Sequence, residues 1–213
     1  MDRSRSIAFP VVLATLAVQL GLGWHPEADR FTWAMENLPV WIGIPLILRH
    51  HKRFPLSNLC LILLGVHALI LALGGHYTYA KVPLGDWAAE TFHLARNPYD
   101  RLGHFAQGFV PAILVRELLL RRSPIGNGKL LMFVCITTCM AFSAFYEFIE
   151  WWTALATGDA AEDFLGTQGD PWDTQWDMFM ATLGASVALF TLSDAHDRSL
   201  SELSSNAREH TPS

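Results

Sequence analysis

Acidic side chains recur at helical spacings beside apolar segments of this chain. Asp173 and Asp177 lie four residues apart in "DPWDTQWDMF", and Glu147 and Glu150 lie three apart in "FYEFIEWW". Residues three or four apart share one face of an α-helix, so the members of each pair are expected to point in one direction. Carboxylates held close together repel one another unless a proton or a cation lies between them. The two pairs therefore indicate a proton-sharing network or a cation site.

A third group lies in "NPYDRLGHFAQG". Asp100, His104 and Gln107 follow one helical stripe, with Arg101 beside it, and His76 ends another apolar run in "GGHY". Histidine and carboxylates together are ligands for Zn²⁺, Mn²⁺ or iron, whereas carboxylates with few histidines suit Mg²⁺ or Ca²⁺. The sequence leaves the cofactor unknown, with a divalent metal ion as the candidate; whether a metal binds, and which, stays open.

These residues are assigned two expected roles. Catalysis, through proton transfer and the binding of an anion, is expected of Glu147, His104 and Arg101. The expected metal ligands are Asp173, Asp177, Glu150, Asp100 and His76. None of the familiar local zinc motifs, HExxH or CxxC, occurs in the chain. The alternative is a hydrogen-bonded network that only locks helix ends together.

The elements that must position these groups are long apolar segments. The chain is 51% hydrophobic and 16% charged, whereas soluble domains carry roughly 25% charged residues. A helix of about 20 apolar residues crosses a hydrocarbon core of about 30 Å. The sequence thus predicts an all-α, polytopic transmembrane helix bundle. Its six expected spans are 7–24, 31–48, 59–75, 104–120, 130–152 and 175–193.

The distribution of basic residues predicts the orientation. Eleven of the fifteen Lys and Arg residues fall in the termini and joins that lie inside if both termini are cytoplasmic, and the join 153–172 has none. Cytoplasmic joins of membrane proteins are enriched in Lys and Arg. We therefore expect six spans with both termini in the cytoplasm, which places the acidic and histidine groups near the outer face.

The domain prediction is a single transmembrane helical domain over residues 1–195. Residues 196–213 are polar and Ser-rich, and a disordered cytoplasmic tail is expected there. Glu117 is expected to be solvated at the cytoplasmic end of its helix. Small residues such as Gly108 and Gly184 are expected to let helices approach closely.

Four motifs in order resemble the YjdF family of bacterial inner-membrane proteins. They are "HYTYAKVPLGDW", "RNPYDRLGHFAQGFVPA", "SAFYEFIEWW" and "FLGTQGDPWDTQWDM", and the likeness covers about residues 30–195. The resemblance implies a multi-pass protein of the bacterial inner membrane. It implies no activity, because that family is a domain of unknown function.

A fainter likeness is to VanZ-like membrane proteins, which are associated with glycopeptide-antibiotic resistance. In the order of that pattern, Asp100 precedes His104 by four residues, Glu147 lies on the next helix, and Asp177 precedes Gly184. Ala181 stands where the pattern has Asn, so the likeness is incomplete.

Three functions remain open from the sequence. The first is a metal-dependent or acid/base site that faces outward and acts on a lipid head group or an envelope precursor. The second is a non-catalytic membrane factor whose polar cluster is structural or binds a partner. The third is an ion-coupled transporter. Such a protein needs polar groups through the full membrane depth, and residues 59–75 and 178–193 carry no charge. The lipid bilayer is the expected environment, and no nucleic-acid partner is expected.

Overall fold

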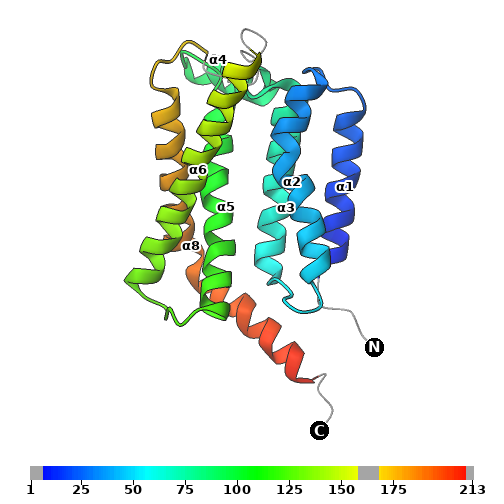
Figure 1. The fold of residues 1–213 in the computed structure, drawn as a ribbon, viewed down its shortest axis with the longest axis vertical. Helices are drawn as coiled ribbons and strands as arrows, with labels where there is room; N and C mark the ends of the chain where they lie inside the picture. The colour runs from blue at the N-terminus through cyan, green and yellow to red at the C-terminus, as the bar shows by residue number, and fades with distance from the viewer. Residues whose placement is uncertain (1–6, 158–167, 210–213) are drawn as a thin grey trace.

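The computed structural model describes residues 7–157 and 168–209, and these residues fold into helices without a strand (Figure 1). The all-α prediction is therefore confirmed for the described part of the chain. The helices there are α1 (Ala8–Trp24), α2 (Arg30–His50), α3 (Asn58–Tyr77), the short 3-10 helix η1 (Tyr79–Lys81), α4 (Pro83–Phe92), α5 (Tyr99–Arg122), α6 (Lys129–Thr157) and α8 (Asp173–Glu209).

Four of the described helices are long and apolar enough to cross a membrane, namely α2, α3, α6 and α8. Helix α1 is apolar but has only 17 residues, and α5 has 24 residues but carries more polar side chains. The bundle surface is apolar as well: Leu20 is 73% exposed and Phe190 is 76% exposed. Such a surface is suited to lipid rather than to water. The count of six spans and the orientation of the termini stay predictions.

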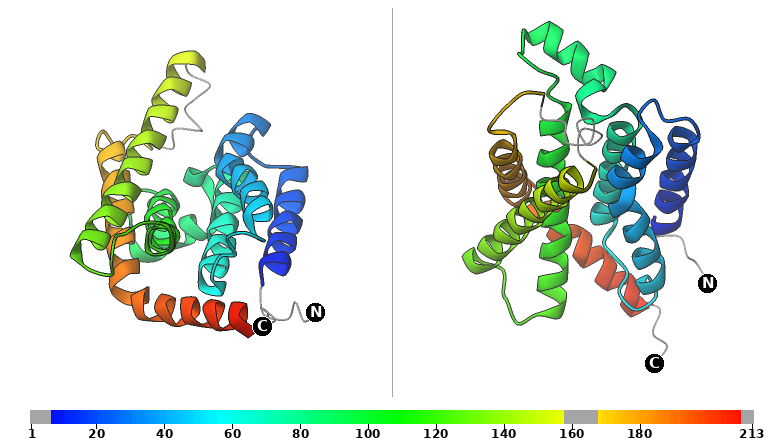
Figure 2. Two further views of the ribbon diagram at one scale, coloured as in Figure 1. Left: turned by 60° about the horizontal axis from the view of Figure 1, so that its bottom comes forward. Right: turned by 45° about the horizontal axis from the view of Figure 1, so that its top comes forward.

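Helix α5 lies at the centre of the bundle and packs against α3, α6 and α8, while α1 and α2 pack on α3 (Figures 1 and 2). The closest crossing is that of α5 and α8. A Cβ atom added to Gly108 would lie 1.8 Å from the carbonyl oxygen of Ala181, and one added to Gly184 would lie 2.0 Å from that of Phe105. The prediction of close approach at these glycines is confirmed.

The two ends of the bundle differ. The α4 end carries α4 and the turn that leads into α8, and it lies at the top of Figure 1. At the opposite end, the last part of α8 bends away and runs across beneath the other helices (Figure 2). Residues 196–209 are helical there, although their polar composition predicted a disordered tail; residues 210–213 lie outside the described ranges.

The extension of α8 is helical because its first turn has buried partners. His196 is fully buried, and the backbone N–H of Leu59 in α3 donates to the Ser199 hydroxyl at 3.2 Å. Although residues 196–209 are mostly polar, the first turn of this segment therefore makes buried contacts with the bundle.

Candidate cation site at the α4 end

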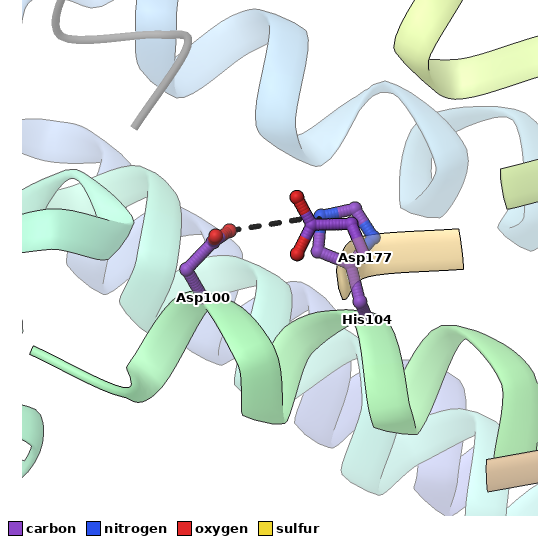
Figure 3. A group of neighbouring side chains, drawn as sticks. All are labelled: Asp100, His104 and Asp177. Carbon is purple, nitrogen blue, oxygen red and sulfur yellow. Dashed lines mark ion pairs between the residues drawn. The ribbon is translucent and has the colours of Figure 1, made fainter. Parts of the chain in front are cut away.

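Side chains from three helices meet in the interior at the α4 end of the bundle. Helix α5 contributes Asp100 and His104, α8 contributes Asp177, and α6 contributes Glu147 and Glu150. Two trios have ligand atoms within 4.8 Å of one another: Asp100–His104–Asp177 and His104–Glu147–Glu150. Figure 3 shows the first trio, with the Asp177 carboxylate beside the imidazole and Asp100 one turn away. All of these side chains are buried except Glu150, which is partly buried.

His104 belongs to both trios, and one neighbour orients its ring. Its Nδ1 lies 2.9 Å from Oε1 of Gln107, which is one turn further along α5. The tautomer that donates Nδ1–H to this oxygen leaves a lone pair on Nε2. Nε2 lies 3.6 Å from Oδ1 of Asp100 and 3.8 Å from Oδ1 of Asp177, which is too far for a hydrogen bond. The lone pair thus faces two carboxylate oxygens.

These separations suit an ion held between the atoms. Two ligands about 2.1 Å from one ion, with about 110–125° between their bonds, lie about 3.4–3.7 Å apart. The distances from Nε2 of His104 to the two aspartates are close to this range. In metal-bound histidines, the ring nitrogen that does not contact the metal commonly donates a hydrogen bond to a neighbouring acceptor, and this bond fixes the ring. Gln107 is such an acceptor for His104.

Two buried oxygens at the site have no hydrogen-bond partner among the described residues. They are Oε1 of Glu147 and Oδ1 of Asp177. A buried carboxylate oxygen without a partner is costly unless a proton or a cation compensates for its lost hydration. A fifth carboxylate nearby, that of Glu36 in α2, accepts a hydrogen bond of 3.2 Å from the Tyr146 hydroxyl. The cluster therefore has more acceptors than donors.

An ion-pair layer covers this cluster on the side of the loops. Arg96 bonds Asp173 and lies 3.2 Å from Asp100 and 3.7 Å from Asp170. Arg101 lies 2.7 Å from Asp170 and stacks over the Trp176 ring, 4.7 Å from its centroid. Asp173 and Asp170 therefore have arginine partners, in contrast to Asp177 and Glu147.

Asp170 shows the electrostatic effect of this layer. The backbone N–H of Trp172 donates to its carboxylate at 2.9 Å, and this hydrogen bond, together with the Arg101 guanidinium, holds the pKa of Asp170 below its usual range. Asp170 is therefore an anion at neutral pH and ties the turn before α8 to α5.

The comparisons with known proteins agree on the family. Residues 7–198 match the family described as "Predicted membrane protein (DUF2238)". The chain belongs to this family. It is also 48% identical over 198 residues to "Inner membrane protein YjdF" of Escherichia coli (strain K12), a match that covers 90% of this chain and 93% of that protein. No solved structure matches significantly. This DUF2238 protein is thus a multi-pass inner-membrane protein, as the sequence motifs implied.

The structure brings together five of the predicted site residues and separates the other three. Glu147, His104, Glu150, Asp100 and Asp177 form the two trios, whereas Asp173 and Arg101 belong to the ion-pair layer. His76 lies elsewhere: its Nδ1 is 2.8 Å from the carbonyl oxygen of Leu22 and ties α3 to the end of α1. Neither trio includes His76.

Gln107 and Tyr146 were not among the predicted site residues. The sequence had placed Gln107 on the stripe of Asp100 and His104, so its spacing was a usable signal. Tyr146 reaches Glu36 from α6 to α2 across 110 positions of the chain, and no local pattern indicates that contact.

A second buried polar cluster lies at the opposite end, and here the expectation for Glu117 was wrong. Glu117 is 0% exposed and accepts hydrogen bonds from the Ser57 hydroxyl at 2.6 Å, Arg121 at 2.6 Å and His196 at 3.1 Å. Arg116 donates to Nδ1 of His196 at 2.9 Å and to Asp197 at 2.7 Å. These contacts join α5, α8 and the start of α3, so the cluster has an evident structural role.

Proposed function

We propose that this DUF2238 protein binds a divalent cation at the α4 end of the bundle and performs metal-dependent or acid/base chemistry there. The proposed ligands are His104, Asp100 and Asp177, with Glu147 beside them. One observation carries the proposal: the free Nε2 of His104 lies 3.6 Å and 3.8 Å from two carboxylate oxygens that are buried with it. One histidine with several carboxylates is a ligand set for Zn²⁺, Mn²⁺ or iron.

The chemistry follows from the second trio. A bound divalent cation would polarise a phosphoryl or carbonyl oxygen, or acidify a bound water. Glu147 has a buried oxygen without a partner among the described residues, and its ligand atom lies within 4.8 Å of that of His104. It is therefore suited to accept a proton from that water. With both termini in the cytoplasm, the site faces outward, where lipid head groups and envelope precursors are the available substrates.

Metal content tests this proposal. Protein purified in mild detergent after growth with Zn²⁺, Mn²⁺ and Fe²⁺ is subjected to elemental analysis, beside the variants Asp177→Asn and Asp173→Asn. The second variant is a matched control, because Asp173 lies four residues away on the same helix but has Arg96 as its partner. We expect about one ion per chain in the wild type and in Asp173→Asn, and a clearly lower metal content in Asp177→Asn, which lacks a ligand.

Two results would contradict the proposal. One is wild-type protein that holds no metal after purification or after dialysis against each ion. The other is a folded Asp177→Asn variant with the metal content of the wild type. Thermal unfolding in detergent reports whether each variant is folded.

A structural role is the second candidate, and the ion-pair layer favours it for part of the cluster. Arg96 and Arg101 already compensate Asp170 and Asp173, so these four residues can stabilise the turn before α8 without any ligand. This candidate predicts that Asp177→Asn and Asp173→Asn both lower thermal stability and that neither changes metal content.

A further inference from the structure

A cavity of about 390 Å³ lies between α2 and α3 on one side and α5 and α6 on the other. Its wall carries Glu36, Asp100, His104 and Glu150 at the α4 end, so the proposed cation site borders it. Further from that end, the wall is almost entirely apolar. It is formed there by residues such as Leu71, Pro111, Leu114, Val115 and Leu118.

The cavity is long as well as apolar. Its α5 wall extends from Asp100 to Leu118, which is about 27 Å at about 1.5 Å per residue. The hydrocarbon core of a bilayer is about 30 Å thick. The cavity thus extends across most of the membrane depth, further than a head group alone would need.

The cavity is partly open at the surface of the bundle. Four of its wall residues are exposed: Pro39 of α2, Leu118 of α5, and Phe142 and Phe145 of α6, which are 61% and 52% exposed. The hydrogen bond between Tyr146 and Glu36 joins α6 to α2 at the polar end of the same gap. A molecule can therefore enter sideways from the membrane between α2 and α6.

A second cavity of about 230 Å³ adjoins the first. Five wall residues are common to both, namely Pro39, His67, Leu71, Pro111 and Leu114. The second cavity lies among α1, α2, α3 and α5, and its wall carries no charged side chain. It extends the apolar space beyond the junction at Leu114.

We infer that the cavity holds the hydrocarbon chain of a phosphate-headed membrane lipid, whose phosphate oxygens bind the cation at His104 and Asp177. The inference rests on the proposed function, since it names the class of substrate for that site. The bilayer supplies chains to an opening between helices, and the apolar wall suits a chain by the hydrophobic effect. The carboxylates at the polar end would repel a phosphate unless the cation is present. Phosphate-lipid binding therefore requires the metal.

Lipid binding to the purified, metal-loaded protein tests the inference by native mass spectrometry. Three probes are titrated: dioleoyl phosphatidic acid, a long-chain polyprenyl monophosphate, and dioleoylglycerol, which has the chains without the phosphate. We expect one of the two phosphate lipids to bind at one per chain, and dioleoylglycerol to bind at least about tenfold more weakly. Which phosphate lipid binds more tightly distinguishes an acyl from a polyprenyl source.

Substitutions in the cavity test the binding of the hydrocarbon chain separately from that of the phosphate head group. Leu114→Trp fills the junction of the two cavities, Val115→Trp fills the first cavity alone, and Leu20→Trp is the control on the lipid-facing surface of α1. We expect each cavity variant that folds to lose about tenfold or more in phosphate-lipid affinity with its metal content unchanged, and Leu20→Trp to bind as the wild type does. Removal of the metal by a chelator should weaken phosphate-lipid binding by a similar factor.

The results that overturn the inference differ from those that overturn the proposed function. Metal-loaded protein that binds neither phosphate lipid, or binds dioleoylglycerol equally well, overturns the inference alone. Folded cavity variants that bind phosphate lipid like the wild type do the same. Wild-type protein that binds no metal overturns the proposed function. It then also overturns the inference that the lipid phosphate binds a cation.

Discussion

At the scale of single residues, two histidines with similar sequence surroundings have different roles. His76 lies in the last turn of α3 and His104 lies near the start of α5, and both were expected in the polar site. The Gln107 amide orients His104 toward Asp100 and Asp177, whereas the Leu22 carbonyl oxygen binds Nδ1 of His76. In both rings an acceptor at Nδ1 leaves Nε2 available as a ligand atom. The surroundings of Nε2 make the difference, because Asp100 and Asp177 lie near that of His104, whereas His76 belongs to neither trio.

Gln107→Leu tests this orienting role. The change removes the acceptor at Nδ1 but no ligand atom, so the metal site should remain with an affinity about 10–100-fold lower. Competition for Zn²⁺ with a chromophoric chelator measures the affinity. The control is Gln175→Leu, the same substitution at an exposed position of α8. Equal affinities in the two variants would refute a role for Gln107.

At the scale of helices, the α5–α8 crossing holds the two halves of the site together. Asp100 and His104 lie on α5 and Asp177 lies on α8, so the spacing of these two helices sets the distances at the site. Backbone contact at Gly108 and Gly184 brings the helices close. Membrane helices commonly associate through small residues in this way.

Gly108→Ala should therefore destabilise the bundle. The new Cβ would lie 1.8 Å from the Ala181 carbonyl oxygen, and the helices would have to move apart. Overpacking of this kind costs about 1–3 kcal/mol, and the thermal unfolding temperature in detergent should fall accordingly. Gly21→Ala is the control, because nothing lies within 4 Å of its added Cβ. Equal unfolding temperatures in the two variants would contradict the close crossing.

At the end of the bundle opposite α4, His196 stabilises the extension of α8. Removing its side chain in His196→Ala leaves Glu117 without one donor and Arg116 without one acceptor, both in buried surroundings. The expected loss of stability is about 1–3 kcal/mol, measured by unfolding in mixed micelles. His50→Ala, at an exposed position, should have little effect. A loss no larger than that of His50→Ala would show that the cluster is not needed for stability.

At the scale of the whole molecule, the bundle is built for a bilayer. Its outer surface is largely apolar, and the buried charged side chains of the described residues lie toward the two opposite ends, around His104 and around Glu117. Between the clusters, α3 and α8 carry no charged residue over 59–75 and 178–193. A continuous charged path across the membrane is therefore not formed by these two helices.

The predicted topology is testable by cysteine labelling. In a chain whose three native cysteines are replaced by Ala, Glu90→Cys and Asn127→Cys place one thiol at each end of the bundle. With six spans and cytoplasmic termini, an impermeant maleimide added to spheroplasts should label the first and reach the second only after lysis. The reverse pattern would place the termini outside and would turn the proposed cation site toward the cytoplasm.

The sequence by itself determined the helical class, the membrane setting, the family and most residues of the candidate site. Apolar length and helical spacing are local properties, so "YEFIE" and "DRLGHFAQ" already align their polar side chains on one helix face. The same reasoning found Gly108 and Gly184 as positions of close approach.

Only the tertiary structure decided which of these groups meet. Asp173 and Asp177 are neighbours on α8, yet one bonds Arg96 and the other faces His104. Glu117 looked solvated because its burial depends on Ser57 and His196, which lie 60 and 79 positions away along the chain. Helix packing sets these distances, and local patterns carry no information about them, because each contact depends on how two separate helices cross.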